Sequence, residues 1–166
     1  MRQNNQEQIM RIFYEFPSKE FTIREIAKLT RIARATVHKT LLELKKDGLV
    51  TKDNKANNNL IFRTKKINYF TEGIVASGLI DEFIEKLNPS CIILFGSIRK
   101  GDSVKESDID LFVESSVKKK IDTKKFEKKL GHKIQLFIES DIRKLHANLF
   151  NNVLNGIKLY GSFKIK

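Results

Sequence analysis

The sequence predicts an α+β protein made of two modules, and three observations lead to this prediction. Residues 1–66 carry apolar side chains at helical spacing and end in segments that favour a hairpin. From residue 88 to residue 166, apolar runs of strand length alternate with helical patterns, which favours a small α/β domain with a mixed sheet. The net charge of +12 is also divided unevenly, with +8 up to Lys66 and +4 from Ile67 onward. A basic excess of this size favours polyanionic partners.

Three helices are expected in the first module. Apolar residues at helical spacing predict the first helix from Glu7 to Phe16. Thr22 and Glu25 match the capping-box pattern, which predicts the start of the second helix. The third helix lies in the segment ARATVHKTLLELKKDGLV, and Gly48 is expected to end it.

Two short segments after the third helix favour a β-hairpin, with strands at Leu49–Thr51 and Asn59–Thr64. The stretch TIREIAKLTRIARATVHKTLLELKKDGLV, followed by this hairpin, resembles the winged helix-turn-helix family of DNA-binding domains. The resemblance implies that the third helix faces double-stranded DNA and that the hairpin reaches adjacent phosphates. The residues expected to contact DNA are Arg34, Thr36, His38, Lys39, Lys52, Lys55 and Arg63. A protein-interaction domain is the alternative for this module.

Residues 67–87 are expected to form a connecting helix that ends at Asn88–Pro89. Two roles are open for it, a dimer interface or a cover on the second module, and the winged-helix resemblance favours a homodimer. No apolar run approaches the roughly 18 residues that a membrane helix requires, and the N-terminus lacks the apolar centre of a signal peptide. We therefore expect a cytoplasmic protein without membrane contact. Cys91, the single cysteine, lies in an apolar run and is expected in the core.

Two aspartates alternate with apolar residues in the second module. Cys91–Phe95 is a continuous apolar run, typical of a strand covered on both faces, and Gly96 and Ser97 begin a turn after it. Asp108 and Asp110 belong to the next expected strand, so both point to one face about 6.6 Å apart. Carboxylates at that spacing repel each other unless a cation or protons offset the charge, and they are ligands suited to Mg²⁺.

This pattern resembles the nucleotidyltransferase superfamily that includes DNA polymerase beta, and in particular its minimal domains. The resemblance runs from about Asn88 to Ser162, and the matching residues are Gly96, Ser97, Gly101, Ser107, Asp108, Asp110 and Leu111. It implies that Asp108 and Asp110 are catalytic residues that bind Mg²⁺, and that ATP or another nucleoside triphosphate is the ligand or substrate. The residues expected to bind the nucleotide are Gly96, Ser97, Gly101 and Ser107. The alternative is a coincidental pair of acids on an exposed edge strand.

The third carboxylate of that superfamily is replaced here. The segment KIQLFIES is expected to be the next strand, and it places Gln135 at the acidic position. Because glutamine cannot take a proton, we expect a DNA-binding regulator that binds a Mg-nucleotide with weak or no catalysis. One alternative is an active nucleotidyltransferase that modifies a protein or a small molecule, and another is a scaffold without a ligand. Minimal domains of this kind are often paired with small helical toxins, so the resemblance also implies such a partner.

Two more helices are expected in the second module, in DTKKFEKKLGH and in DIRKLHANLFNNVLNGIKLYG. The lysine cluster of residues 118–129 overlaps the first of them. It is either a second contact with nucleic acid or a solvated face, and the solvated face is the usual meaning of a charge run.

Overall fold

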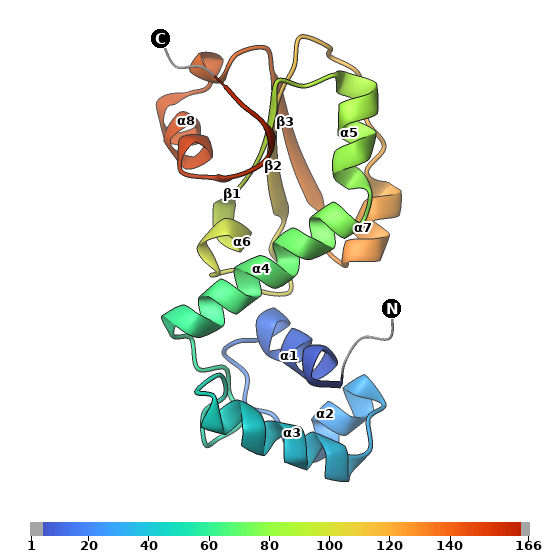
Figure 1. Cartoon of the computed structure of the whole chain (residues 1–166), viewed down its shortest axis with the longest axis vertical. Helices are drawn as coiled ribbons and strands as arrows, with labels where there is room; N and C mark the ends of the chain where they lie inside the picture. Colours follow the sequence, from blue (N-terminus) through green and yellow to red (C-terminus); the bar gives the residue numbers. More distant parts are fainter. Residues whose placement is uncertain (1–4, 164–166) are drawn as a thin grey trace. The chain divides into compact units, whose positions relative to one another are not determined.

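The computed structural model describes residues 5–163, in which eight α-helices, one 3-10 helix and a four-stranded sheet are formed (Figure 1). The chain divides into two compact units. Unit 1 comprises Met1–Lys66 and Ser103–Lys105, and unit 2 comprises Ile67–Asp102 and Glu106–Lys166. The helices are α1 (Asn5–Glu15), α2 (Ile23–Thr30), α3 (Arg34–Lys46), α4 (Leu60–Ala76), α5 (Leu79–Leu87), α6 (Gly96–Lys100), α7 (Lys124–Leu130), the 3-10 helix η1 (Ile142–Lys144) and α8 (Ala147–Leu154). The strands are β1 (Cys91–Phe95), β2 (Ile109–Glu114), β3 (Ile134–Glu139) and β4 (Ile157–Gly161).

Helices α1, α2 and α3 enclose the core of unit 1, as their apolar spacing predicted. The buried side chains of this core include Ile9, Phe13, Ile26, Val37, Leu41 and Leu44. The capping box at the start of α2 is present, because the hydroxyl of Thr22 accepts from the N–H of Glu25 (3.2 Å) and the carboxylate of Glu25 accepts from the N–H of Thr22 (2.8 Å). Gly48 follows the end of α3 with φ +69°, as expected for the residue after a helix.

The second strand of the expected hairpin is wrong. Val50 and Ala56 form only an isolated β-bridge, and residues 60–64 are the first turns of helix α4. The carboxamide oxygen of Asn59 accepts from the N–H of Phe62 (2.9 Å), which caps that helix. Phe62 is fully buried, so packing also favours the helix over the strand that Leu-Ile-Phe suggested. Arg63 therefore lies on α4 and not on a hairpin.

Three residues distant in sequence complete unit 1. Lys66 is fully buried, and its ammonium group donates to the carbonyl oxygen of Ser103. The backbone N–H of Lys105 donates to the carbonyl oxygen of Glu15 (2.8 Å), and its ammonium group lies 3.0 Å from the carboxylate of Glu15. Arg11 also contacts this carboxylate, at 3.6 Å. The segment Ser103–Lys105 thus supplies partners for two buried charged side chains of unit 1.

The connecting segment contains two helices instead of one. Helix α4 ends at Ala76, and α5 begins at Leu79. The hydroxyl of Ser77 accepts from the N–H of Leu79 (3.1 Å), so Ser77 supports the start of α5. Gly78 occupies the break with φ +86°.

The sheet of unit 2 is mixed, as expected, with the strand order β3-β2-β1-β4. Strand β2 pairs in parallel with β3, whereas β1 pairs antiparallel with both β2 and β4. All five residues of β1 are buried, because helices cover both faces of the sheet. Figure 1 shows α8 on one face and α5 with α7 on the other. On the α8 face, a buried apolar cluster is formed by Cys91, Ile93, Phe95, Phe112, Ile142 and Val153.

The expected final helix through Gly161 is wrong in its last part. The helix α8 ends at Leu154, and β4 then pairs with the open edge of β1. Gly156 makes the turn, because a Cβ atom there would lie 2.2 Å from the Ile93 side chain and 2.8 Å from the carbonyl oxygen of Leu94. Pairing with β4 also satisfies backbone groups of β1 that would otherwise be buried without partners.

Replacing Gly156 by alanine should destabilise unit 2. Because the new methyl group overlaps with Ile93 and Leu94, we expect Gly156→Ala to lower the free energy of unfolding by about 1–3 kcal/mol, measured by urea denaturation. Gly73→Ala is the matched control, since the nearest side-chain atom there is 3.9 Å away and the site is helical. It should be neutral or stabilising. Equal losses in the two variants would contradict the close approach at Gly156.

Candidate functional site

Asp110 lies on the central strand β2, between a residue of β1 and a residue of β3. Its register partners are Phe95 on β1 and Gln135 on β3. Gly96 follows directly after β1 and has φ +73°. A Cβ atom at this glycine would lie 1.9 Å from the Oδ2 atom of Asp110, so the carboxylate packs directly against the Gly96 backbone. The fold thereby brings Gly96 and Asp110 together, although they are 14 positions apart in the sequence.

The two aspartates interact electrostatically. Burial and the negative charge of Asp108 both raise the pKa of Asp110, in that order of importance. Both side chains are half-buried, so the repulsion is less screened than it would be on an open surface. A cation placed between the carboxylates would offset this charge.

The turn expected after β1 is a short helix, α6. Gly96 and Ser97 are its first residues, and Gly101 ends it with an N–H donated to the carbonyl oxygen of Ile98 (3.0 Å). The first backbone N–H groups of a helix have no intrahelical acceptor and point away from its body. The Gly-Ser pair therefore presents backbone donors at the end of the strand next to Asp110.

His132 contacts this site, although its sequence spacing suggests only a structural or surface residue. The ring is 5% exposed, and its Nδ1 atom lies 2.7 Å from the carbonyl oxygen of Ser107. Because a carbonyl oxygen only accepts hydrogen bonds, Nδ1 carries the proton. Ser107 immediately precedes Asp108, so the imidazole is bonded to the backbone that leads into the aspartates.

Gln135 lies next to Asp110 in the parallel ladder, so the two side chains are on the same face of the sheet. The other acids of these strands are engaged elsewhere. Glu114 accepts from the N–H of Ile142 (2.9 Å) and from the hydroxyl of Ser90 (2.5 Å), and Glu139 forms an ion pair with Lys118 (3.7 Å). Within residues 5–163, no group of three or more His, Cys, Asp or Glu side chains is placed to hold a metal ion.

A comparison with protein-family models decides the family of unit 2. The model described as a nucleotidyltransferase domain matches residues 76–163, which is just over half of the chain. The chain belongs to the nucleotidyltransferase domain family. Neither a curated protein nor a solved structure gives a significant match. The matched residues of this nucleotidyltransferase domain include all four strands, the Gly-Ser pair and both aspartates.

Members of this family generally use nucleoside triphosphates with Mg²⁺. The residues of the nucleotidyltransferase domain fit Mg²⁺ in two respects. Asp108 lies one position before β2 and not within the strand as expected, but its carboxylate interacts electrostatically with that of Asp110. The two side chains therefore offer two hard oxygen ligands, and the raised pKa of Asp110 reflects a negative charge that a divalent ion would offset. Cys91 lies at the opposite end of β1 from Gly96, and burial raises the pKa of its thiol to about 11.

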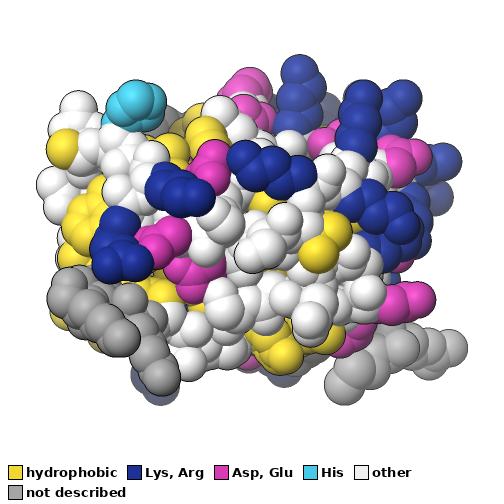
Figure 2. Space-filling view, turned by 90° about the horizontal axis from the view of Figure 1, so that it is seen from above, with side chains coloured by type: hydrophobic (Ala, Val, Ile, Leu, Met, Phe, Trp, Pro, Cys, Tyr) yellow, Lys and Arg dark blue, Asp and Glu magenta, His cyan; other side chains and the backbone are white. Residues whose placement is uncertain are grey.

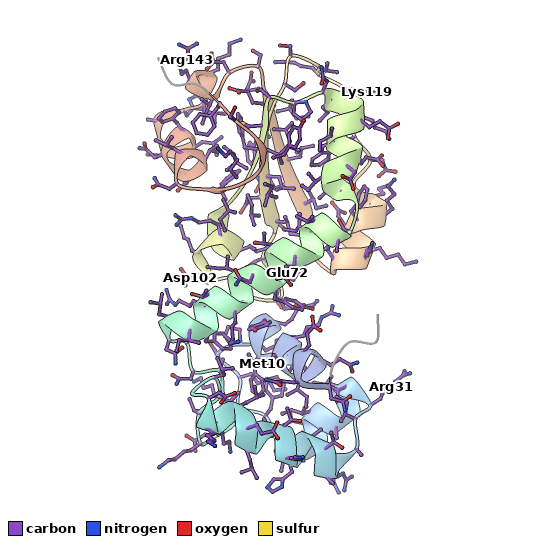
Figure 3. All side chains as sticks on the ribbon, in the orientation of Figure 1. Met10, Arg31, Glu72, Asp102, Lys119 and Arg143 are labelled. Atoms are coloured by element: carbon purple, nitrogen blue, oxygen red, sulfur yellow. The ribbon has the colours of Figure 1, made fainter. Side chains whose placement is uncertain are left out.

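The residues expected to contact DNA lie on three segments of unit 1. Arg34, His38 and Lys39 are exposed on α3, and Thr36 is half-buried there. Lys52 is exposed in the turn after Val50, Lys55 is half-buried in it, and Arg63 donates to the Asn58 side chain (3.2 Å) from α4. The sequence analysis missed Arg31, which is exposed in the turn between α2 and α3 and points away from the helices (Figure 3).

The lysine cluster of residues 118–129 is partly used inside unit 2. Lys125 pairs with Glu82 (2.6 Å), Lys118 pairs with Glu139 (3.7 Å), and Lys129 donates to the carbonyl oxygens of Ala76 and Ser77 (3.2 and 3.0 Å). On the face drawn in Figure 2, acidic side chains are interspersed among the Lys and Arg side chains. The pairings of Lys118, Lys125 and Lys129 favour the solvated face over a second nucleic-acid contact.

The raised pKa of Asp110 predicts a pH-dependent loss of stability that Mg²⁺ should reverse. Because the folded state holds this proton more tightly than the unfolded chain, stability falls as pH rises from below the ordinary value of 3.8 through the folded-state pKa. The Asp110→Asn variant should therefore melt above the metal-free wild type at pH 7 and approach it below pH 3.8. Mg²⁺ at about 100 times its Kd should raise the wild-type Tm at pH 7 by about 5–10 °C and leave the variant unchanged.

Differential scanning fluorimetry across pH, with and without Mg²⁺, measures these shifts. Glu106→Gln is the control, since it neutralises an exposed acid in the loop before Asp108. The melting temperature of this control should match that of the wild type at each pH, with and without Mg²⁺. If Asp110→Asn melts at the wild-type temperature at pH 7, the two aspartates are not electrostatically strained.

Proposed function

We propose that the chain is a DNA-binding regulator whose nucleotidyltransferase domain binds a nucleoside triphosphate with Mg²⁺ and transfers nucleotides weakly or not at all. The observation that carries the proposal is the register of β2 and β3, in which Gln135 is the partner of Asp110. A carboxylate at this position would be placed to take a proton from an acceptor group. The amide of Gln135 donates and accepts hydrogen bonds but takes no proton at neutral pH.

Loss of a general base has a large effect on the rate of transfer. Such a base is typically worth about 10²–10⁴-fold in rate, which corresponds to roughly 3–5 kcal/mol of barrier. Neither Glu114 nor Glu139 substitutes for it, because both are engaged and both lie four positions further along their strands, about 13 Å away. Transfer is therefore slow even where binding is intact.

Binding depends on groups that are present. Asp108 and Asp110 would hold Mg²⁺, which when bound offsets the charge of a triphosphate. The backbone donors of Gly96 and Ser97 would hold phosphate oxygens, and the missing side chain of Gly96 lets the carboxylate of Asp110 lie directly beside them.

DNA binding by unit 1 is supported by charge and exposure. The first 66 residues carry a net charge of +8, and α3 exposes Arg34, His38 and Lys39. Three helices followed by a bridged turn are compatible with a winged helix whose wing is reduced to residues 50–56. Arg31, in the turn before α3, would add a phosphate contact. A homodimer on palindromic DNA is part of this proposal.

The second candidate is an active nucleotidyltransferase that modifies a protein, such as a small helical toxin, or a small molecule, with unit 1 as a targeting or autoregulatory domain. It is favoured by the intact arrangement of Gly96, Asp108 and Asp110.

Within the part of the chain that the structure describes, no helix has both the length and the apolar character needed to cross a membrane.

Restoring the missing acid separates these candidates. Gln135→Asp should raise nucleotide transfer by about 10²–10⁴-fold, because it returns a proton acceptor to the face that carries Asp110. The measurements are pyrophosphate release and incorporation of α-labelled ATP, GTP, CTP and UTP by the full chain. Titration calorimetry of the same nucleotides should show Mg²⁺-dependent binding in both the wild type and this variant, and loss of binding in Asp108→Ala/Asp110→Ala.

Each outcome has a distinct meaning. Wild-type transfer at a rate that Gln135→Asp does not increase would support the active enzyme and contradict the proposed regulator. No Mg²⁺-dependent binding of any of the four nucleotides would contradict both candidates and leave the fold as a scaffold. Gln135→Asn is the matched control, since it keeps the amide and should stay at the wild-type rate.

DNA binding should be steeply salt-dependent. For a labelled duplex of about 30 base pairs, log K should fall linearly with log salt concentration, with a slope of about −0.9 for each phosphate contacted. Arg34→Ala/Lys39→Ala should reduce the magnitude of this slope by about 2. Lys124→Ala/Lys128→Ala on α7 removes the same charge from unit 2 and should leave the slope unchanged. Fluorescence anisotropy measures the affinities, and a slope insensitive to the α3 substitutions would contradict the assignment.

A further inference from the structure

We infer that His132 is a positioning residue for the aspartate pair, acting through the backbone of Ser107 and Asp108. This inference rests on the proposed Mg-nucleotide site and adds a residue to it that lies outside the family motif. His132 reaches the site through the backbone. Its Nδ1–H donates to the carbonyl oxygen of Ser107 at 2.7 Å.

The two aspartates are held in different ways. Asp110 lies inside β2, and the ladders to β1 and β3 fix its backbone on both sides. Asp108 precedes β2, so no strand pairing holds it. Hydrogen bonds hold the residues on either side of Asp108 instead. The carbonyl oxygen of Ser107 accepts from the imidazole of His132, and the N–H of Ile109 donates to the carbonyl oxygen of Lys133 (2.8 Å). Both hydrogen bonds come from the two residues that directly precede β3.

The position of His132 is itself well determined. Gly131 ends α7, and its N–H donates to the carbonyl oxygen of Glu127 (2.8 Å). The carboxylate of Glu127 then accepts from the N–H of Ile134 (3.1 Å), which fixes the start of β3. Between these two points, the imidazole packs edge-on against Phe70, with ring centroids 5.2 Å apart at 85°. A buried ring held in this way is a rigid donor.

Rigidity matters because the two carboxylates repel each other. Without the tie at Ser107, Asp108 is free to rotate away from Asp110, and the metal loses one of its two oxygen ligands. Removal of a group that orients a metal ligand typically costs about 10–100-fold in metal affinity. Removing the imidazole should therefore weaken metal binding although every ligand remains.

Three variants of the full chain test this inference. His132→Leu removes the donor and keeps an apolar side chain against Phe70, whereas His132→Asn returns an amide N–H close to the position of Nδ1. His146→Leu is the matched control, because His146 is exposed in the same unit. Mn²⁺ is the probe, and its affinity is measured by electron paramagnetic resonance titration. Hydrogen exchange of the Ile109 amide, without metal, is the second readout, compared with Phe112 at the centre of the same strand.

We expect His132→Leu to lose about 10–100-fold in Mn²⁺ affinity and to exchange the Ile109 amide faster, with Phe112 unchanged. His132→Asn should recover most of the Mn²⁺ affinity and most of the protection of the Ile109 amide. His146→Leu should match the wild type in both measurements. Unchanged affinity and exchange in His132→Leu would overturn the inference. Equal losses in the Leu and Asn variants, with a matching fall in Tm, would reduce His132 to a packing residue and also overturn it.

The hydrogen-exchange result separates this inference from the proposed function. If the wild type binds Mn²⁺ no better than Asp108→Ala/Asp110→Ala, the proposed metal site is wrong. Exchange at Ile109 then still decides the role of His132: faster exchange in His132→Leu with recovery in His132→Asn supports positioning, and any other pattern rejects it.

Discussion

The carboxylates of Asp108 and Asp110 repel each other, and the surrounding structure keeps them together. Asp110 is placed by strand pairing on both sides, and the absence of a side chain at Gly96 gives its carboxylate room. Asp108 depends on ties to the residues between α7 and β3. Burial strengthens the repulsion and raises the pKa of Asp110. The arrangement is costly without a cation, and such a cost is typical of sites selected for binding and not for stability.

A site that binds without reacting suits regulation. If Gln135 makes transfer slow, a bound nucleotide persists and its occupancy follows its concentration. An active transferase would instead consume the nucleotide, so the occupancy of the site would also depend on the rate of turnover. On the proposed function, a regulator and a transferase with this fold differ in one side chain of β3, and the difference lies in proton transfer rather than in affinity. This is why binding and turnover have to be measured separately on the same variants.

Features that depend on neighbouring residues could be predicted from the sequence, and features that depend on distant ones could not. The capping box of α2 and the alternation of apolar residues around Asp110 are local patterns, and both were found. The side chains after Asn59 favour a strand, whereas burial of Phe62 and the cap at Asn59 select a helix. Strand β4 needs the open edge of β1, which no local pattern reveals. The hydrogen bond of His132 spans 25 positions and left no signal in its own segment.

The composition of unit 1 has a practical consequence. Because Ser103–Lys105 belongs to it, this unit is discontinuous in the sequence. A fragment that stops at Lys66 would lack the carbonyl oxygen that accepts from the buried Lys66 and the ammonium group that pairs with the buried Glu15. Removing a partner of a buried charged group is destabilising, and a domain of this size is only marginally stable. Expression of residues 1–66 alone should thus give a poorly folded, protease-sensitive fragment, and fusing back a short peptide that carries residues 103–105 is the rational repair.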